Sequence, residues 1–169
     1  LGVAVFAMNG EKMEEVIGNL LKENKKTLSI AESCTGGLVA RRVTEVSGSS
    51  EYFIEGAICY ANEAKIRSLS VPKELIEEHG AVSAEVAEAM ARGMREKAQT
   101  DYAISVTGIA GPTGGTEEKP VGLVFVGYAD EFQAKSFKIL LPGDRYLIRW
   151  RASQAALDYL RRKKKKKMQ

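Results

Sequence analysis

The sequence has few of the residues that hold metals or form disulfide frameworks. Its 169 residues include two cysteines and one histidine. Cys34 and Cys59 do not form a CxxC pair, and two cysteines are too few for a disulfide framework. With His79 as the single histidine, standard zinc sites built from nitrogen and sulfur ligands are excluded. These shortages indicate a reduced, cytoplasmic protein with no catalytic metal, and we expect no cofactor.

Long apolar segments are also missing. No apolar run approaches the roughly 20 residues that a membrane-spanning helix requires, so we expect no membrane partner. The start, LGVAVFAMNG, is apolar but short, and it lacks the basic flank of a signal peptide. It also lacks an initiator methionine. We therefore expect either a processed chain or a piece of a longer protein, in which residues 1–10 are a linker or an extra strand from a possible upstream domain.

Positive charge is scarce outside one short segment. Seven of the 25 lysines and arginines fall in RRKKKKK (161–167), which leaves 18 basic residues against 22 acidic ones elsewhere. A mildly acidic body lacks the basic face of a nucleic-acid-binding domain, so we do not expect nucleic acid as a partner. Residues 163–169 are predicted to be a basic tail, a solvated end to the last helix.

Strand and helix patterns alternate through the rest of the chain, whose composition of 44% apolar and 28% charged residues is that of a globular domain. The patterns predict helices at 11–24, 36–46, 62–69, 71–80, 83–99 and from 144 to about 162, and strands at 26–32, 56–61, 101–108, 121–129 and 131–141. The last strand is expected to run antiparallel to its neighbour. This order predicts a single α/β domain over 11–162, with three α/β/α layers around a mixed sheet.

Hydroxyls and glycines gather in ESCTGG (32–37), between a predicted strand and a predicted helix. Unpaired amides at the start of a helix, with the positive end of its dipole, bind phosphate or carboxylate. Ser33 and Thr35 add hydroxyl donors, and Gly36 and Gly37 let a ligand approach the backbone. The spacing is not that of a Walker loop. The segment predicts either an anion site or an ordinary N-cap with a tight turn.

A serine and a lysine near the next strand offer a second candidate. Gly48 can end the helix that precedes it, and Ser50 can cap the segment that follows. Lys65 lies in the first turn of a helix that begins at Asn62, where the dipole disfavours an ammonium. A lysine with a lowered pKa can act as a base toward a serine. The alternatives are a simple cap and a solvated lysine.

A second glycine-rich loop, VTGIAGPTGG (106–115), follows a strongly apolar strand. Ligands of open α/β sheets gather at such strand ends, although a flexible surface loop has the same composition. Cys34 lies beside the first loop, but no histidine motif is present to activate it, so we interpret it as a small packed residue.

Several of these motifs occur in an order and spacing that resemble the CinA C-terminal domain family. The motifs are AESCTGG (31–37), SGSSEYF (47–53), YANEAK (60–65), GAVSAEVAEAMA (80–91), VTGIAGPTGGTEEKPVG (106–122) and GDR (143–145). The resemblance extends from about residue 12 to residue 160. The chain departs from the family pattern at Ser47, where proline or alanine is frequent, and at Ala61, where serine is common.

The resemblance implies an activity and a set of site residues. The family contains nicotinamide-nucleotide amidases, which hydrolyse nicotinamide mononucleotide to nicotinate mononucleotide and ammonia, alone or fused behind a nucleotide-pyrophosphatase domain. Ser50, Tyr60 and Lys65 resemble the family's serine–lysine–tyrosine catalytic group, with Ser50 as nucleophile, Lys65 as base and Tyr60 relaying the proton or orienting the lysine. Ser33 is the rival nucleophile. The residues expected to bind substrate are Ser33, Thr35, Gly36, Gly37, Gly108, Ala110, Gly111 and Arg145.

We therefore expect an amidohydrolase whose partner is a small-molecule nucleotide. A pyridine-nucleotide-binding module without chemistry, serving an attached domain, is the alternative, because related loops can persist when activity is lost. Intact Ser50, Tyr60 and Lys65 favour the enzyme. A homo-oligomer and a fused upstream domain are both compatible with the sequence.

Overall fold

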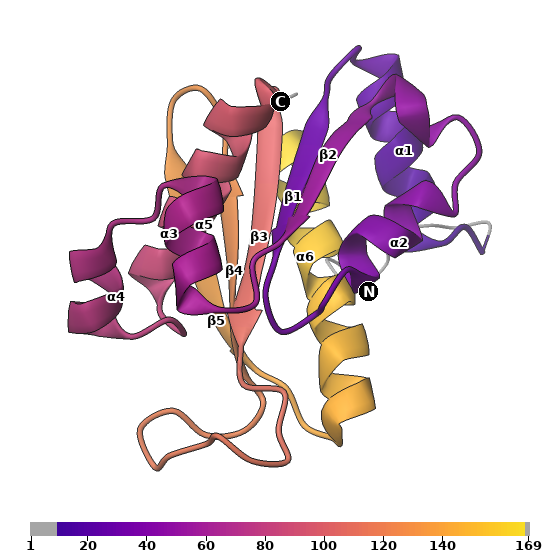
Figure 1. Cartoon of the computed structure of the whole chain (residues 1–169). Coiled ribbons are helices and arrows are strands. Elements are labelled where there is room, and N and C mark those ends of the chain that lie inside the picture. Colours follow the sequence, from indigo (N-terminus) through magenta and orange to yellow (C-terminus); the bar gives the residue numbers. More distant parts are fainter. Residues whose placement is uncertain (1–9, 168–169) are drawn as a thin grey trace.

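A five-stranded mixed sheet forms the centre of the protein (Figure 1). The computed structural model describes residues 10–167, so almost all of the predicted 1–10 linker lies outside the described residues. The strands are β1 (Leu28–Glu32), β2 (Phe53–Ile58), β3 (Tyr102–Gly108), β4 (Leu123–Ala129) and β5 (Ala134–Leu140). The helices are α1 (Met13–Glu23), α2 (Leu38–Thr44), the 3₁₀ turn η1 (Ser49–Glu51), α3 (Asn62–Leu69), α4 (Lys73–His79), α5 (Ala84–Ala98) and α6 (Arg145–Lys167).

Strand direction brings several loops to one edge of the sheet. The strand order is β2-β1-β3-β4-β5, in which β1 pairs in parallel with both β2 and β3. β4 is antiparallel to β3 and to β5. The carboxyl ends of β1, β2, β3 and β5 therefore share one edge. The chain runs from β1 to β2 on one side of β1 and then crosses to β3 on the other side, so the strand order reverses beside β1. This reversal makes the β1/β3 boundary the topological switch point where α/β proteins bind ligands.

Helices cover both faces of the sheet, as Figure 1 shows: α1, α2 and α6 lie on one side, and α3, α4 and α5 on the other. The larger core joins α1, α2 and α6 to the sheet, with members such as Ile17, Val39 and Leu157. The smaller core lies under α5, whose Val86, Met90 and Met94 are fully buried. The methionines that recur every four residues are thus core residues. The predicted single α/β domain with three layers is confirmed.

A buried ion pair joins the three helices of the larger core. The Arg42 guanidinium of α2 is 3% exposed and donates to Glu14 Oε2 of α1 at 2.7 Å. It also donates to Ser153 Oγ and Gln154 Oε1 of α6, and it lies 4.5 Å from the ring centroid of Trp150. These bonds compensate for burying a charge and fix α6 against α2.

Three elements have boundaries that differ from the sequence prediction. β2 spans 53–58 instead of 56–61, because the carbonyl oxygens of Cys59 and Tyr60 accept from the Lys65 side chain instead of continuing the strand. α2 begins at Leu38, since Gly36 and Gly37 have φ of 60° and 95°. α6 continues to Lys167, so most of the predicted tail is helical, and the Lys163 Nζ lies 5.0 Å from the ring centroid of Tyr159.

The contact between α5 and the end of α3 provides a test of the packing. A Cβ added to Gly93 would lie 1.8 Å from the carbonyl oxygen of Leu69, which is backbone and cannot rotate away. We expect Gly93→Ala to lower the free energy of unfolding by about 3 kcal/mol, although alanine normally favours a helix. Urea denaturation would measure this change. Arg92→Ala, at the exposed neighbouring position, should stay within about 0.5 kcal/mol of wild type. Equal stability of the two variants would contradict the close helix contact.

Candidate functional site

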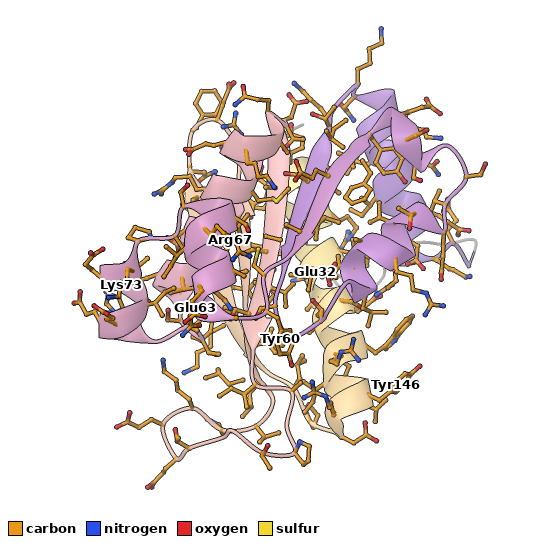
Figure 2. All side chains as sticks on the ribbon, in the orientation of Figure 1. Glu32, Tyr60, Glu63, Arg67, Lys73 and Tyr146 are labelled. Atoms are coloured by element: carbon orange, nitrogen blue, oxygen red, sulfur yellow. The ribbon has the colours of Figure 1, made fainter. Side chains whose placement is uncertain are left out.

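The candidate site lies at the carboxyl edge of the sheet, beside the switch point between β1 and β3. Ser33 follows β1 directly, and its amide donates to the carbonyl of Val106 in β3 at 2.9 Å. Residues 59–61 follow β2, and α6 begins near this edge after β5. Figure 2 shows Tyr60 and Glu32 in this region between the strands and α6, whereas Tyr146 points outward from α6.

Lys65 is the central charged group of the site. It is 1% exposed, and its Nζ donates to Ser33 Oγ at 3.2 Å, to the carbonyl of Cys59 at 3.0 Å and to the carbonyl of Tyr60 at 3.1 Å. All three acceptors are uncharged. Burial of the ammonium lowers the pKa of Lys65 below its ordinary value of 10.5. The site thus holds an amine whose neutral, proton-accepting form is favoured by burial, in contact with a buried serine hydroxyl.

The structure does not bring Ser50 to Lys65, so the expected catalytic pair of Ser50 and Lys65 is not formed. Ser50 is exposed in η1, immediately before β2, whereas Lys65 follows β2. The two residues therefore lie at opposite ends of this strand, which is six residues long. In Figure 1 the segment between α2 and β2 lies at the other end of the sheet from loop 109–122. Ser33, the rival nucleophile, occupies the position beside the lysine.

The predicted anion nest is filled by a carboxylate of the protein itself. Glu32 is 1% exposed and accepts from the amides of Gly37 at 3.0 Å, Val39 at 3.1 Å and Ala40 at 2.8 Å. The Gly37 amide is therefore already used by Glu32, and this internal negative charge disfavours a second anion at the helix start. Glu32 was missed because it ends an otherwise ordinary strand pattern.

The turn that follows Ser33 keeps some of its backbone donors available. The Gly36 amide bonds to the Ser33 carbonyl at 3.0 Å, and the Leu38 amide bonds to the Thr35 carbonyl at 3.3 Å. Within residues 10–167, the amides of Cys34 and Thr35 donate to no other residue. The Thr35 side chain is fully buried, and its Oγ1 has no hydrogen-bond partner within the same range.

The glycine-rich loop and α6 approach the site through Arg145. Its Nη1 donates to the carbonyl of Gly111 at 2.7 Å, and its Nη2 donates to the hydroxyl of Tyr60 at 3.0 Å. Ala110 is buried beside them. Gly108 packs against β4, since an added Cβ would lie 2.8 Å from the carbonyl oxygen of Leu123. The structure thus places Tyr60, Arg145 and the 109–111 segment together.

Arg149 belongs to the same region, although the sequence interpretation did not include it. Its Nη2 donates to the carbonyl of Thr35 at 2.8 Å, and an added Cβ on Gly36 would lie 3.3 Å from the same nitrogen. The signal was present in the spacing, because residues four apart share one face of a helix. Arg145 and Arg149 have this spacing at the start of α6.

Neither cysteine has the environment of a nucleophile. Cys34 is 5% exposed, and burial raises the pKa of its thiol to about 12. Burial also raises the pKa of the Cys59 thiol. Interpretation of Cys34 as a packed residue agrees with these values, since the reactive form is the thiolate.

Two further searches of residues 10–167 gave negative results. No group of three or more His, Cys, Asp or Glu side chains lies close enough together there to hold a metal ion. No helix in that range combines the length and the apolar character needed to cross a membrane.

The buried lysine makes a prediction about the pH dependence of stability. Because the pKa of Lys65 is lower in the folded protein than in the unfolded chain, the unfolded chain binds more protons as pH falls below 10.5. Protonation therefore destabilises wild type in this range, but it cannot do so in Lys65→Met. We expect the unfolding free energy of Lys65→Met minus that of wild type to increase as pH falls from 10.5 toward neutrality. Urea titrations at several pH values would measure it, and a difference independent of pH would contradict the burial of this amine.

Comparison with known proteins identifies relatives whose descriptions agree with one another. Residues 10–164 match the model of the CinA C-terminal domain family. A CinA-like protein of Geotalea daltonii is 56% identical over 162 residues, which are 96% of this chain and 39% of the relative. A CinA-like protein of Koribacter versatilis is 52% identical over 160 residues, with the same 39% of its length covered. The chain thus spans about two fifths of the length of these curated relatives.

Solved structures share the same fold. The competence/damage inducible protein CihA from Agrobacterium tumefaciens superposes with a TM-score of 0.84 at 35% identity, over 92% of this chain and 97% of that one. A competence-damaged protein (CinA) superfamily protein from Klebsiella pneumoniae has a TM-score of 0.86 at 28% identity, over 91% and 98% of the two chains. Since the family model matches nearly the whole described chain, this chain belongs to the CinA C-terminal domain family.

Proposed function

We propose that the protein is an amidohydrolase that converts nicotinamide mononucleotide to nicotinate mononucleotide and ammonia, with Ser33 as nucleophile and Lys65 as base. The observation that carries the proposal is the 3.2 Å contact between Lys65 Nζ and Ser33 Oγ, in which the lysine is 1% exposed. Buried lysines with a lowered pKa activate serine in hydrolases that have no histidine. The substrate class comes from the resemblance of the motifs to nicotinamide-nucleotide amidases.

The first half of the reaction breaks the amide bond. Neutral Lys65 accepts the proton of Ser33 Oγ while this oxygen attacks the carboxamide carbon, which gives a tetrahedral oxyanion. The protonated lysine then donates its proton to the leaving nitrogen. Ammonia departs, and an acyl ester remains on Ser33.

The second half restores the enzyme. Lys65, now neutral again, accepts a proton from a water molecule that attacks the ester carbon. The tetrahedral species collapses with transfer of this proton to Ser33 Oγ, which releases the nicotinate product. A cationic pyridinium ring in the substrate favours the neutral form of Lys65, because like charges repel.

Backbone amides next to the nucleophile can stabilise the oxyanion. The amides of Cys34 and Thr35 donate to no other residue in the described range, and they belong to the turn that carries Ser33. Donors fixed in advance at the developing charge are a major source of catalysis in acyl transfer. Glu32 supports this arrangement indirectly, since its bonds to the Gly37 and Val39 amides hold the same turn.

Tyr60 orients the lysine through its main chain. Its carbonyl oxygen accepts from Lys65 Nζ, whereas its hydroxyl accepts from Arg145. We therefore assign the orienting role to the Tyr60 backbone and propose no proton relay through its hydroxyl.

Substitution of the proposed pair tests the function. Ser33→Ala should lower kcat for ammonia release by on the order of a thousandfold, because the covalent intermediate cannot form. Lys65→Ala should have a similar effect, and the double variant should be little worse, since the two residues act as a unit. Lys65→Arg should not restore activity, because a guanidinium does not deprotonate to act as a base. Steady-state ammonia release from nicotinamide mononucleotide would measure these rates.

Ser50→Ala is the matched control, since it removes the same hydroxyl at the opposite end of β2. It should retain nearly normal kcat, and circular dichroism should show that all variants are folded. A folded Ser33→Ala with a normal rate would overturn the nucleophile assignment. Wild-type protein that binds nicotinamide mononucleotide without releasing ammonia would instead identify a binding module.

A further inference from the structure

We propose that Arg145 and Arg149 bind the dianionic phosphoryl group of the substrate, and that Arg149 thereby fixes the turn that carries Ser33. The inference rests on the proposed function and assigns the phosphate to α6 instead of to the start of α2. It makes Arg149 a phosphate-binding and positioning residue.

The first argument is that the two arginines have no carboxylate partner in the part of the chain that the structure describes. Arg145 donates to a carbonyl and a phenol, and Arg149 donates to a carbonyl, so neither bonds to a carboxylate within residues 10–167. Several other basic side chains of the fold are paired with acids, as the ion pairs Arg42–Glu14, Lys26–Asp101 and Lys97–Glu55 show. Two uncompensated guanidinium groups on one helix face suit a dianion, to which arginine can donate in pairs.

The second argument is the exclusion of the alternative site. At the start of α2, Glu32 already accepts from three amides, so both the donors and the positive end of the helix dipole are used. A substrate phosphate therefore needs other donors at this edge of the sheet. The arginines of α6 provide them.

The third argument is the separation between the arginines and the cleaved bond. Tyr60 connects the two regions, because its carbonyl accepts from Lys65 at 3.1 Å and its hydroxyl accepts from Arg145 at 3.0 Å. The lysine amine and the guanidinium thus contact opposite ends of the same tyrosine residue. A nucleotide with a ribose between its carboxamide-bearing ring and its phosphate has a spacer of this kind.

The fourth argument is the contact of Arg149 with the catalytic turn. Its Nη2 donates to the carbonyl of Thr35, two residues after Ser33. Arginine has five N–H donors, so Arg149 can hold Thr35 and a phosphoryl oxygen at the same time. A bound phosphoryl group then restrains Arg149, which in turn restrains Thr35 and the Cys34–Thr35 amides.

The test compares a substrate with and without phosphate. In Arg149→Met, kcat/KM for nicotinamide mononucleotide should fall by on the order of a hundredfold, because charge-assisted bonds are lost. The slower turnover of nicotinamide riboside, which has no phosphate, should fall by a clearly smaller factor, because this substrate loses only the restraint of Thr35. Added inorganic phosphite should accelerate cleavage of the riboside by wild type but not by Arg149→Met. Arg149→Lys should retain only part of this activation, and it serves in place of the methionine variant if that variant does not fold.

Arg151→Met is the matched control, since Arg151 is exposed on the same helix and also donates to a carbonyl, that of Pro142. It should behave as wild type in every assay. Equal losses on both substrates in Arg149→Met would overturn the proposal, since they would show a general structural role. Calorimetric titration with inorganic phosphate tests binding without turnover: equal affinity of wild type and Arg149→Met would overturn the proposal even if neither substrate is cleaved, whereas weaker binding by the variant would support it.

Discussion

The Glu32 carboxylate accepts hydrogen bonds from the amides of Gly37, Val39 and Ala40, and the geometry of the site follows from this contact. A buried carboxylate requires several donors, and the start of a helix supplies them from backbone alone. The bonds close a short loop between the end of β1 and α2. Ser33 and Thr35 lie inside that loop, so their positions relative to Lys65 and Arg149 are set by the same carboxylate.

The position of α6 is the second requirement for this site. Arg145 and Arg149 reach the site only because α6 packs across α2 and the sheet. The buried Arg42 guanidinium, which bonds to Glu14, Ser153 and Gln154, holds α2, α1 and α6 together. Ile148 and Ala152 are almost completely buried on the same side of α6 as these contacts. A polar network within the larger core thus determines where two exposed or half-buried arginines point.

The fold was largely predictable from the sequence, because apolar periodicity and turn residues determine most of its elements. The apolar patterns of β3, β4 and α5 are strong, and the predicted ranges nearly match the observed ones. Pairing across the site was harder to predict. Ser50 and Lys65 are close in sequence, but a strand between two residues carries them to opposite ends of the sheet. The predicted strand at 56–61 already implied this separation.

Other features of the site depend on contacts that the apolar periodicity of the sequence cannot predict. Glu32 ends a strand and binds amides five to eight residues later, which only the folded turn brings into reach. Ser33 and Lys65 are 32 positions apart, and their contact requires the parallel pairing of β1 with β2. Arg149 was within reach of sequence reasoning, because its spacing from Arg145 places both on one helix face.

The location of α6 after all the strands in the sequence has a consequence for biosynthesis. A ribosome-bound chain that ends at β5 already contains Ser33, Lys65 and the glycine-rich loop, but α1 and α2 cover only part of one face of its sheet. Ile148, Ala156, Leu157 and Leu160 complete the cover of that face only when the helix emerges. The arginines emerge with it. The protein therefore gains its full core and completes the candidate site in the same late step of synthesis, so incomplete chains carry Ser33 and Lys65 without the arginines beside them.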